Sequence, residues 1–149
     1  MGITDSVRSV LDKKGGSLYH VAPETPVFEA LEAMAQYDIG ALMVISGAQL
    51  CGVFSERDYA RKVILHGKAS RETTVSEIMS GPPIVAHPGQ TVDDCMHLMI
   101  HYRIRHLPVV EDGAILGVLS IGDLVDWIIH RQDEEIAHLN HYIAGTYPA

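Results

Sequence analysis

The chain contains the same segment twice at a constant spacing of 65 positions, and this duplication restricts its fold more than any other feature. Gly52–Asp58, with the sequence GVFSERD, returns as Gly117–Asp123, with the sequence GVLSIGD. The same offset aligns further identical residues without any insertion, namely Pro23 with Pro88, Val27 with Val92, Met34 with Met99, Tyr37 with Tyr102 and Ile39 with Ile104. Chance does not align so many positions at one offset, which indicates two copies of one structural unit.

Each copy has the same expected order of elements, β-α-β-β-α. The expected strands are short apolar runs, at 17–22, 41–45 and 50–54 in the first copy and at 82–87, 106–110 and 115–119 in the second. Apolar residues at helical spacing predict a helix at 27–34 and another at 92–99, with Thr25 and Thr91 available as N-terminal caps. A second helix is expected to begin at each Ser-x-x-Asp.

A single copy is too small to bury both faces of its sheet, so the two copies should pack together. We therefore expect an α/β (α+β) fold in which two β-α-β-β-α repeats form a pseudo-twofold pair. The predicted boundaries are 1–66 for an N-terminal helix with repeat 1, 67–79 for a polar linker with one docked helical turn, and 80–149 for repeat 2 with an extended C-terminal helix.

That last helix continues beyond what the first copy contains, and it carries an apolar stripe at Ile136, Leu139 and Ile143. Packing of this stripe on the protein core is the favoured interpretation, and a dimer contact is the alternative.

The composition excludes several classes of protein. Apolar residues make up 47% of the chain, enough for a hydrophobic core, and the formal charge of −8 disfavours general binding to nucleic acid or anionic membranes. The first residues, MGITDSVRSVL, lack the long apolar run of a signal peptide, and no apolar run reaches membrane-spanning length, so we expect neither a signal peptide nor a membrane span. Cys51 and Cys95 lie in apolar runs and form no CxxC pair, which is typical of buried, reduced thiols. We expect a cytoplasmic protein.

The repeated Ser-x-x-Asp has two interpretations. Ser followed three residues later by an acid is the capping-box pattern, which satisfies free amides at the start of a helix. The same geometry can bind a nucleoside phosphate, because a helix start favours phosphate and a carboxylate one turn later can accept two hydrogen bonds from a ribose diol. Gly52 and Gly117 would allow another backbone or a ligand to approach closely.

The paired segments resemble a tandem pair of CBS domains (cystathionine-β-synthase domains), also called a Bateman module. The motifs that carry the resemblance are GALMVI…GVFSERD in the first copy and IRHLPVVEDGAILGVLSIGDL in the second. It covers about 17–129, and the segments SERDYARK and YIAG are similar to those of small stand-alone bacterial CBS-pair proteins. The resemblance implies a sensor of adenosine nucleotides, with AMP as the commonest ligand and ADP, ATP, NAD(H) and S-adenosylmethionine as relatives.

In that family each nucleotide lies in the cleft between the repeats, where the Asp of the motif holds the ribose and the opposite repeat covers the adenine. The resemblance therefore implies two sites. The first consists of Ser55, Arg57, Asp58, Pro83, Ile84, Arg105 and His106. The second consists of Ser120, Gly122, Asp123, Leu18, Tyr19, Ile39 and Gly40. The Tyr19 ring either stacks on adenine or is an ordinary tyrosine of the core or its edge.

The two implied sites differ in charge. Arg57 of the first copy corresponds to Gly122 of the second, and the first site also takes Arg105 and His106. A phosphate dianion is neutralised best where guanidinium groups gather, since they offer paired hydrogen bonds. We therefore predict that the Asp58 site binds AMP-like ligands more tightly than the other site.

No set of residues in the sequence predicts catalysis. The chain contains no nucleophile elbow, P-loop or dinucleotide-binding glycine motif. His97 and His101 lie four residues apart, with Asp93 on the same side, but no further ligand motif follows. We interpret them as an exposed polar face rather than as a metal site, and we expect neither an enzyme nor a bound metal.

The leading hypothesis is a non-catalytic regulatory module for signal transduction, in which an adenine nucleotide changes the angle between the repeats or between subunits. A ligand can shift such an equilibrium only through different affinities for the two conformations. We expect a homodimer whose contacts come from the helices that begin at Val27, Asp58, Val92 and Asp123, and a downstream protein target that the sequence does not identify. The alternative is a protein-interaction module with vestigial nucleotide sites.

Overall fold

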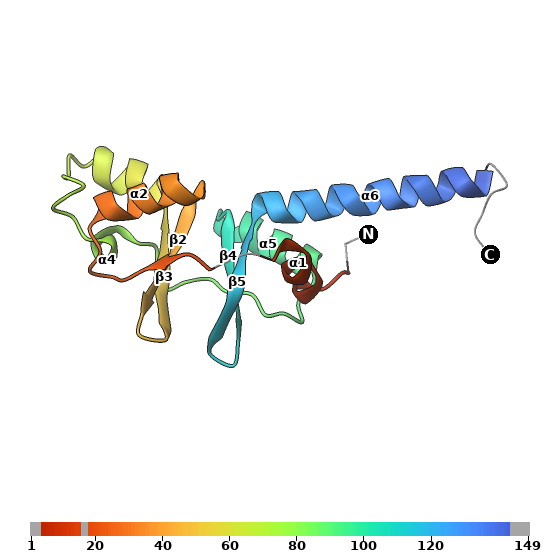
Figure 1. Ribbon diagram of the computed structural model, residues 1–149, viewed down its shortest axis with the longest axis horizontal. Coiled ribbons are helices and arrows are strands. Elements are labelled where there is room, and N and C mark those ends of the chain that lie inside the picture. The colour runs from red at the N-terminus through yellow and green to blue at the C-terminus, as the bar shows by residue number, and fades with distance from the viewer. Residues whose placement is uncertain (1–3, 16–17, 144–149) are drawn as a thin grey trace. The chain divides into compact units, whose positions relative to one another are not determined.

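The computed structural model describes residues 4–15 and 18–143, so the parts of the predicted segments at 1–3, 16–17 and 144–149 lie outside the described residues (Figure 1). The chain forms two compact units. Unit 1 contains Met1–Gly15, Pro88–Leu107 and Leu119–Ala149, and unit 2 contains Gly16–His87 and Pro108–Val118. Mixed helices and strands with two small sheets confirm the predicted fold class. The predicted boundaries between repeats and linker stay a prediction.

The first repeat supplies a three-stranded sheet with the order β1-β2-β3. Its strands are β1 (His20–Val21), β2 (Ala41–Ser46) and β3 (Gln49–Ser55), with β1 parallel and β3 antiparallel to β2. The helix α2 (Val27–Tyr37) packs on this sheet. The core between them contains fully buried side chains of both elements: Val27, Ala30, Met34, Leu42, Val44 and Phe54. Apolar spacing therefore located the helix and the hairpin correctly, although β1 is shorter than expected.

The second repeat has the same order after its first strand. It contains α5 (Val92–Tyr102), β4 (His106–Glu111), β5 (Ala114–Ser120) and α6 (Ile121–Ile143). Both α2 and α5 end on a left-handed residue, Asp38 with φ 52° and Arg103 with φ 54°. These two residues are related by the repeat offset, so the duplication extends to the helix ends.

The prediction of a strand at 82–87 is wrong. Only Ala86 pairs there, as an isolated parallel bridge to Val109. The Ala86 amide donates to the carbonyl of Pro108 and the Val110 amide donates to the carbonyl of Ala86, each at 2.8 Å. The preceding Pro82 and Pro83 have no amide proton to donate, so they cannot contribute to a ladder. The first repeat has no proline at the equivalent positions, and there β1 forms.

The second helix of the first repeat begins as predicted but changes its winding. A short α-helical turn, α3 (Glu56–Asp58), continues directly into η1 (Tyr59–Ile64), which has π-helical hydrogen bonding. In the second repeat the equivalent segment is regular α6. Single π turns occur frequently at functional sites, and nothing in the sequence pattern indicated this one.

The segment preceding each repeat docks on the first helix of the other repeat. α1 (Val7–Lys14) precedes repeat 1, yet Val92 at the start of α5 donates its amide to the carbonyl of Asp5, at 2.9 Å. α4 (Val75–Ile78) precedes repeat 2, yet Val27 at the start of α2 donates to Thr73, at 2.8 Å. This exchange explains why α1 belongs to the same unit as α5, and α4 to the same unit as α2. It also confirms that the segment predicted as a linker contains one docked helical turn.

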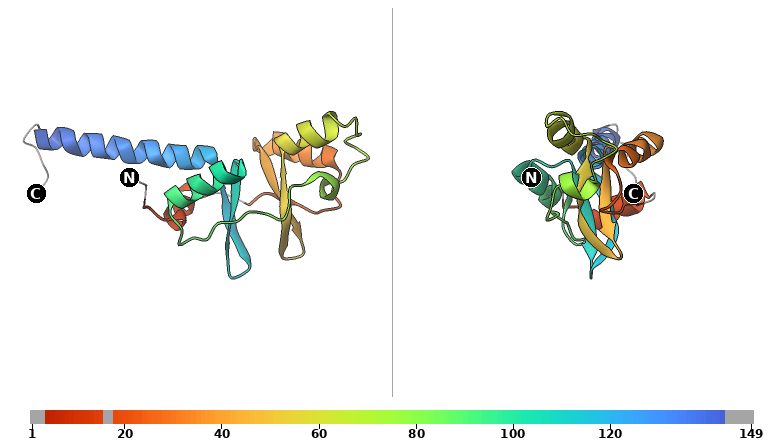
Figure 2. Two further views of the ribbon diagram at one scale, coloured as in Figure 1. Left: turned by 180° about the vertical axis from the view of Figure 1, so that it is seen from behind. Right: turned by 90° about the vertical axis from the view of Figure 1, so that its left-hand side faces the viewer.

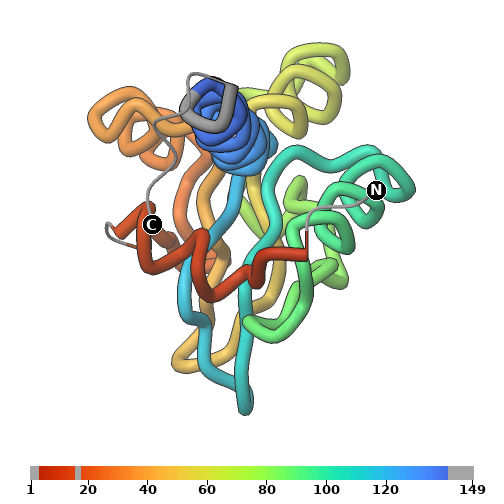
Figure 3. Tube along the Cα trace, turned by 90° about the vertical axis from the view of Figure 1, so that its right-hand side faces the viewer, coloured from red at the N-terminus to blue at the C-terminus, as the bar shows by residue number. Residues whose placement is uncertain are grey.

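The two docked segments have matching sequences. Ser6 and Thr74 stand at the two N-caps, and each is followed by two buried apolar residues, Val7 and Val10 in α1 and Val75 and Ile78 in α4. These apolar residues are part of the buried core. In unit 1, α1 lies beside α6, as the view nearly along α6 shows (Figure 3).

The two cysteines are free, as expected, but they differ in burial. Cys95 is fully buried on α5, whereas Cys51 on β3 is half-buried. Burial raises the pKa of the Cys95 thiol to about 11, and the neighbouring Asp94 carboxylate adds to the rise. Cys95 therefore stays a neutral, unreactive thiol at physiological pH.

The prediction that the C-terminal stripe packs on the core is wrong for the side chains that the structure describes. Ile136 and Leu139 are each 57% exposed, and the helix from Arg131 to Asn140 is exposed along its whole length. The side chain of Ile143 lies outside the described part. None of the described helices is long and apolar enough to cross a membrane.

Candidate functional site

The first Ser-x-x-Asp forms the turn between β3 and α3, and it is a capping box. The amide of Asp58 donates to Ser55 Oγ at 3.2 Å, and the amide of Ser55 donates to Asp58 Oδ2 at 3.0 Å. The local interpretation of the motif is therefore confirmed in this copy. It does not exclude the other interpretation, because a carboxylate can accept about four hydrogen bonds.

The Asp58 carboxylate has further partners that the sequence did not reveal. The Ser80 hydroxyl donates to Oδ1 at 2.8 Å, Lys62 Nζ lies 3.3 Å from the same oxygen, and the Ser55 hydroxyl donates to Oδ2 at 3.1 Å. The residue is 6% exposed. The carboxylate thus accepts three hydrogen bonds and has an ion-pair partner within the chain, so a ribose diol would compete with Ser80 and Lys62 for Oδ1.

Gly52 brings Ser80 to this carboxylate. Val53 and Ser80 exchange backbone hydrogen bonds of 3.1 and 2.9 Å, which hold the second residue after α4 against strand β3. A Cβ atom on Gly52 would lie 2.7 Å from the backbone oxygen of Ser80 and 2.9 Å from Met79 Sδ. The predicted close approach at Gly52 is therefore an approach of backbone, not of a ligand.

The second Ser-x-x-Asp forms the equivalent turn between β5 and α6 in unit 1. The amide of Asp123 donates to Ser120 Oγ at 3.1 Å, and the amide of Ser120 donates to Asp123 Oδ2 at 2.8 Å. In place of Ser80 and Lys62, its partner is Lys14 at the end of α1, whose Nζ lies 2.8 Å from Oδ2. The two aspartates thus share their local geometry and differ in their long-range partners.

The environment of Asp123 favours its charged form. Burial acting alone would raise the pKa of this carboxyl, but the hydrogen bonds from Lys14 and from the Ser120 amide outweigh that effect and lower it below its ordinary value. A lowered pKa in the folded state stabilises the fold above the ordinary pKa of Asp, about 4, and the contribution is lost as the pH falls through the folded value.

Replacing Lys14 by methionine should therefore destabilise the protein by about 0.5–1 kcal/mol at pH 7, a small effect because the pair is partly exposed. The difference between wild type and Lys14→Met should shrink as the pH falls from 5 towards 3, where Asp123 takes up its proton. Urea unfolding across this pH range measures the difference. A difference that stays constant down to pH 3 would show that the ion pair does not stabilise the fold.

The two turns are also equivalent in a backbone contact that was not expected. The Glu56 amide donates to the carbonyl of Gly40 at 3.1 Å, and the Ile121 amide donates to the carbonyl of Arg105 at 2.8 Å. Gly40 and Arg105 are related by the repeat offset. Each repeat therefore fixes the loop ahead of its own hairpin against the first turn of its own second helix.

The other predicted residues lie as follows. Arg57 is exposed on α3, and Pro83 and Ile84 are half-buried in the segment before Ala86. In unit 1, Arg105 is exposed before β4, His106 is half-buried and Gly122 is exposed. Each predicted site takes residues from both units, and its assembly stays a prediction.

Of the residues predicted to cover the second site, Tyr19 and Ile39 are half-buried and pack against the core of unit 2. The Tyr19 ring stacks on Tyr37, with centroids 4.2 Å apart and planes 23° from parallel. One face of the ring is thus already covered, which favours the interpretation of Tyr19 as a residue of the core edge.

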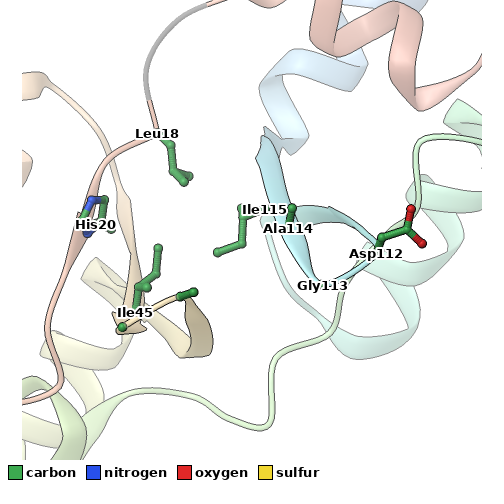
Figure 4. Close-up of a pocket in the computed structure, with 9 residues that line it drawn as sticks. Leu18, His20, Ile45, Asp112, Gly113, Ala114 and Ile115 are labelled. Atoms are coloured by element: carbon green, nitrogen blue, oxygen red, sulfur yellow. The ribbon is translucent and has the colours of Figure 1, made fainter.

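Leu18, another predicted residue, lines an open hollow of about 490 Å³ in unit 2 (Figure 4). Its side chain points towards the same space as Ile45 and Ile115, while Asp112 lies in the tight turn at the far side. The inward-pointing groups are aliphatic, so the hollow suits an apolar group better than a phosphate.

The histidines considered as metal ligands are exposed on α5. His97 Nδ1 lies 3.8 Å from Asp93, and His101 packs edge-on against Tyr102. Within residues 4–15 and 18–143 there is no group of three His, Cys, Asp or Glu side chains that could hold a metal ion.

Comparison with known proteins identifies the repeats. The family model of the CBS domain matches 7–65 and 75–130. The CBS domain-containing protein CBSX3, mitochondrial, from Arabidopsis thaliana is 37% identical over 97% of this chain and 73% of its own length. The CBS domain-containing protein YhcV from Bacillus subtilis is 32% identical over 78% of this chain and 82% of its own length.

Solved structures show the same similarity. A putative signal-transduction protein with CBS domains from Burkholderia ambifaria is 42% identical and superposes with a TM-score of 0.82, covering 85% of this chain and 96% of its own. The similarity therefore extends over both repeats and over nearly the whole of that protein.

Proposed function

The chain belongs to the CBS-domain family, as a tandem pair of CBS domains, and on that premise we propose that it binds an adenine nucleotide of the AMP type and acts as a regulatory module. The observation that carries the proposal is the pair of equivalent turns, each of which holds a carboxylate, Asp58 or Asp123, at the junction of a strand and a helix. A carboxylate so placed can accept both hydroxyls of a ribose.

The ligand class has support from a more distant relative. The CBS domain pair of MJ0100, which is 22% identical to this chain with a TM-score of 0.75, was crystallised with 5′-methylthioadenosine and S-adenosyl-L-methionine. Both compounds contain adenosine, so they share the base and the ribose diol with AMP, ADP, ATP and NAD. We propose adenosine as the recognised element and AMP as the preferred ligand.

We propose that the Asp58 site is the tighter one. Arg57, Arg105 and His106 are the residues proposed to neutralise its phosphate, and Lys62, which lies 3.3 Å from Asp58 Oδ1, is a further candidate. When a ribose diol replaces Lys62 on the carboxylate, the released ammonium group becomes available to the phosphate. At the Asp123 site the equivalent competitor is Lys14, which belongs to α1.

Nucleotide binding would act through a change in the angle between repeats or between subunits, with Arg57 and 103–106 drawn towards the phosphate. We propose a homodimer with contacts from the helices that begin at Val27, Asp58, Val92 and Asp123, and a separate protein target. We propose no catalytic role and a cytoplasmic location; the name of the Arabidopsis relative states a mitochondrial location for that protein.

The alternative is an interaction module whose nucleotide sites are vestigial. The full set of partners of Asp58 favours it, since the carboxylate is satisfied without any ligand. Under this alternative the Ser-x-x-Asp motifs persist only because they cap helices.

Thermal unfolding with AMP, ADP, ATP, NAD and S-adenosylmethionine separates the two functions. A ligand at 100 times its dissociation constant stabilises the folded state by about 2.7 kcal/mol, so AMP should raise the melting temperature by about 5–10 °C. AMP that lacks the 2′-hydroxyl should stabilise far less, because only one ribose hydroxyl remains for the aspartate. No shift with any of the five ligands would support the vestigial alternative.

A further inference from the structure

The exposed face of α6 carries a regular seam of side chains that the nucleotide proposal does not use. Val125, Ile129, Gln132, Ile136 and Leu139 follow one another at intervals of four, three, four and three residues. This is the spacing of the a and d positions of a heptad. The four aliphatic members are 42%, 50%, 57% and 57% exposed in chain order, and Gln132 is exposed as well.

The seam lies on a different face of α6 from the side chains that hold the helix to its own unit. The helix is held to unit 1 by the buried Leu124, by the Trp127 indole, which donates to Asp5 at 2.8 Å, and by Arg131, which pairs with Asp5 at 3.0 Å. At about 100° per residue, the centre of these anchoring groups lies roughly 125° around the helix from the centre of the seam, so the anchors and the seam occupy different faces. The far half of α6 extends beyond α1 and α5 (Figure 2).

We propose that this seam pairs with the same seam of a second copy of this chain, as a parallel, in-register two-stranded coiled coil. A second copy suits the seam because both helices then present a and d positions at one period. An irregular groove of another protein would not require a regular alternation of three and four residues. The proposal extends the homodimer proposed above to the exposed part of α6, and it does not depend on nucleotide binding.

The charges beside the seam select the parallel orientation. Asp133 and Glu135 flank it, in the e and g positions. In a parallel pair, Asp133 faces the partner's Ile128 and Glu135 faces the partner's Asn140, so acids do not meet. In the antiparallel pair centred on residue 134, Asp133 and Glu135 would each face their own copies, and like charges repel there.

Gln132 fixes the register. In the parallel pair, Gln132 lies opposite the partner's Gln132, and the two amides can bond to each other. A shift by one heptad would place this amide against aliphatic side chains and leave it without a hydrogen-bond partner, which is costly in a buried seam. One polar residue in a seam therefore sets the register at some cost in stability.

Sedimentation equilibrium of the full chain tests whether the seam of α6 forms the contact between two copies. The double variant Ile136→Asp/Leu139→Asp places two charges in the seam of a helix segment that is already exposed, so its unit should still fold. We expect its dimer dissociation constant to rise at least about tenfold over that of the wild type. The control Ala137→Asp adds a charge to the same exposed segment outside the seam, and it should dimerise as the wild type does. Equal dissociation constants for the seam and control variants would overturn the proposal.

Cross-linking tests the orientation. With Cys51 replaced by serine and Cys95 buried, Gln132→Cys should form a disulfide-linked dimer when diamide is added, and Ala137→Cys should not. Absence of a Gln132→Cys dimer would exclude the parallel register. Thermal shift with AMP on the seam variant reports nucleotide binding separately, so a failed dimer and a failed nucleotide site are distinguishable.

Discussion

Replacing Asp58 by alanine should lower the free energy of unfolding by about 2–4 kcal/mol, one of the two largest effects expected of any single substitution at the candidate sites. The change removes the acceptor for the Ser55 amide, the Ser80 hydroxyl and the Lys62 ammonium together. Asp58 is buried and Ser55 is half-buried, so water does not fully replace the lost bonds. Urea unfolding followed by circular dichroism at pH 7 measures the loss.

The matched control is Asp123→Ala, which removes the equivalent aspartate of the other repeat. Its side chain is 25% exposed, and its long-range partner Lys14 is 38% exposed, so water can replace part of what is lost. We expect the free energy of unfolding to fall by about 1–2 kcal/mol, mostly because the substitution removes the helix cap formed by Ser120 and Asp123. Equal losses in the two variants would mean that Ser80 and Lys62 contribute nothing through Asp58.

Replacing Gly52 by alanine should destabilise the protein by about 2–3 kcal/mol, because the added methyl group meets backbone that cannot rotate away. The new Cβ would lie 2.7 Å from the oxygen of Ser80, so the Val53–Ser80 pairing must open. Opening that pairing also withdraws the Ser80 hydroxyl from Asp58. The substitution should therefore weaken the site as well as the fold, measurable as a lower denaturation midpoint in urea.

Gly89→Ala provides the control for Gly52→Ala. A Cβ on Gly89 meets nothing within 4 Å, and its backbone does not have a positive φ. Alanine there should change stability by less than about 0.5 kcal/mol or raise it slightly, since it restricts the unfolded chain. If both glycine variants unfold at the same urea concentration, the close approach at Gly52 does not constrain the fold.

The sequence was a good guide wherever the governing interaction is local. Helical spacing located α2 and α5, apolar runs located the hairpins, and the Ser-x-x-Asp pattern predicted both capping boxes. It failed at 82–87, where apolar composition suggested a strand but Pro82 and Pro83 lack the amides of a ladder. Apolar composition shows that a segment can form a strand, but prolines within it prevent the hydrogen bonds that a strand needs.

Contacts between distant segments could not be predicted. Ser80 lies 22 residues from Asp58, and Lys14 lies 109 residues from Asp123, with no periodicity to connect them. Lys62 could have been found, since it is four residues after Asp58 in the helical segment that α3 and η1 form together. The burial of the seam of α6 could not be predicted for the same reason. The spacing of its residues identifies an apolar face of the helix, but it does not show whether other segments of the chain pack on that face.

Calorimetric titration of the chain with AMP tests the central claim most directly. We predict saturable binding that weakens at least about tenfold in Asp58→Asn, whose amide can replace the cap acceptor but offers only one oxygen to the ribose. Removing the 2′-hydroxyl from AMP should cost the wild type a similar factor and cost Asp58→Asn little more. If AMP binds the double variant Asp58→Asn/Asp123→Asn as tightly as it binds the wild type, the two carboxylates do not hold the ribose and the account is contradicted.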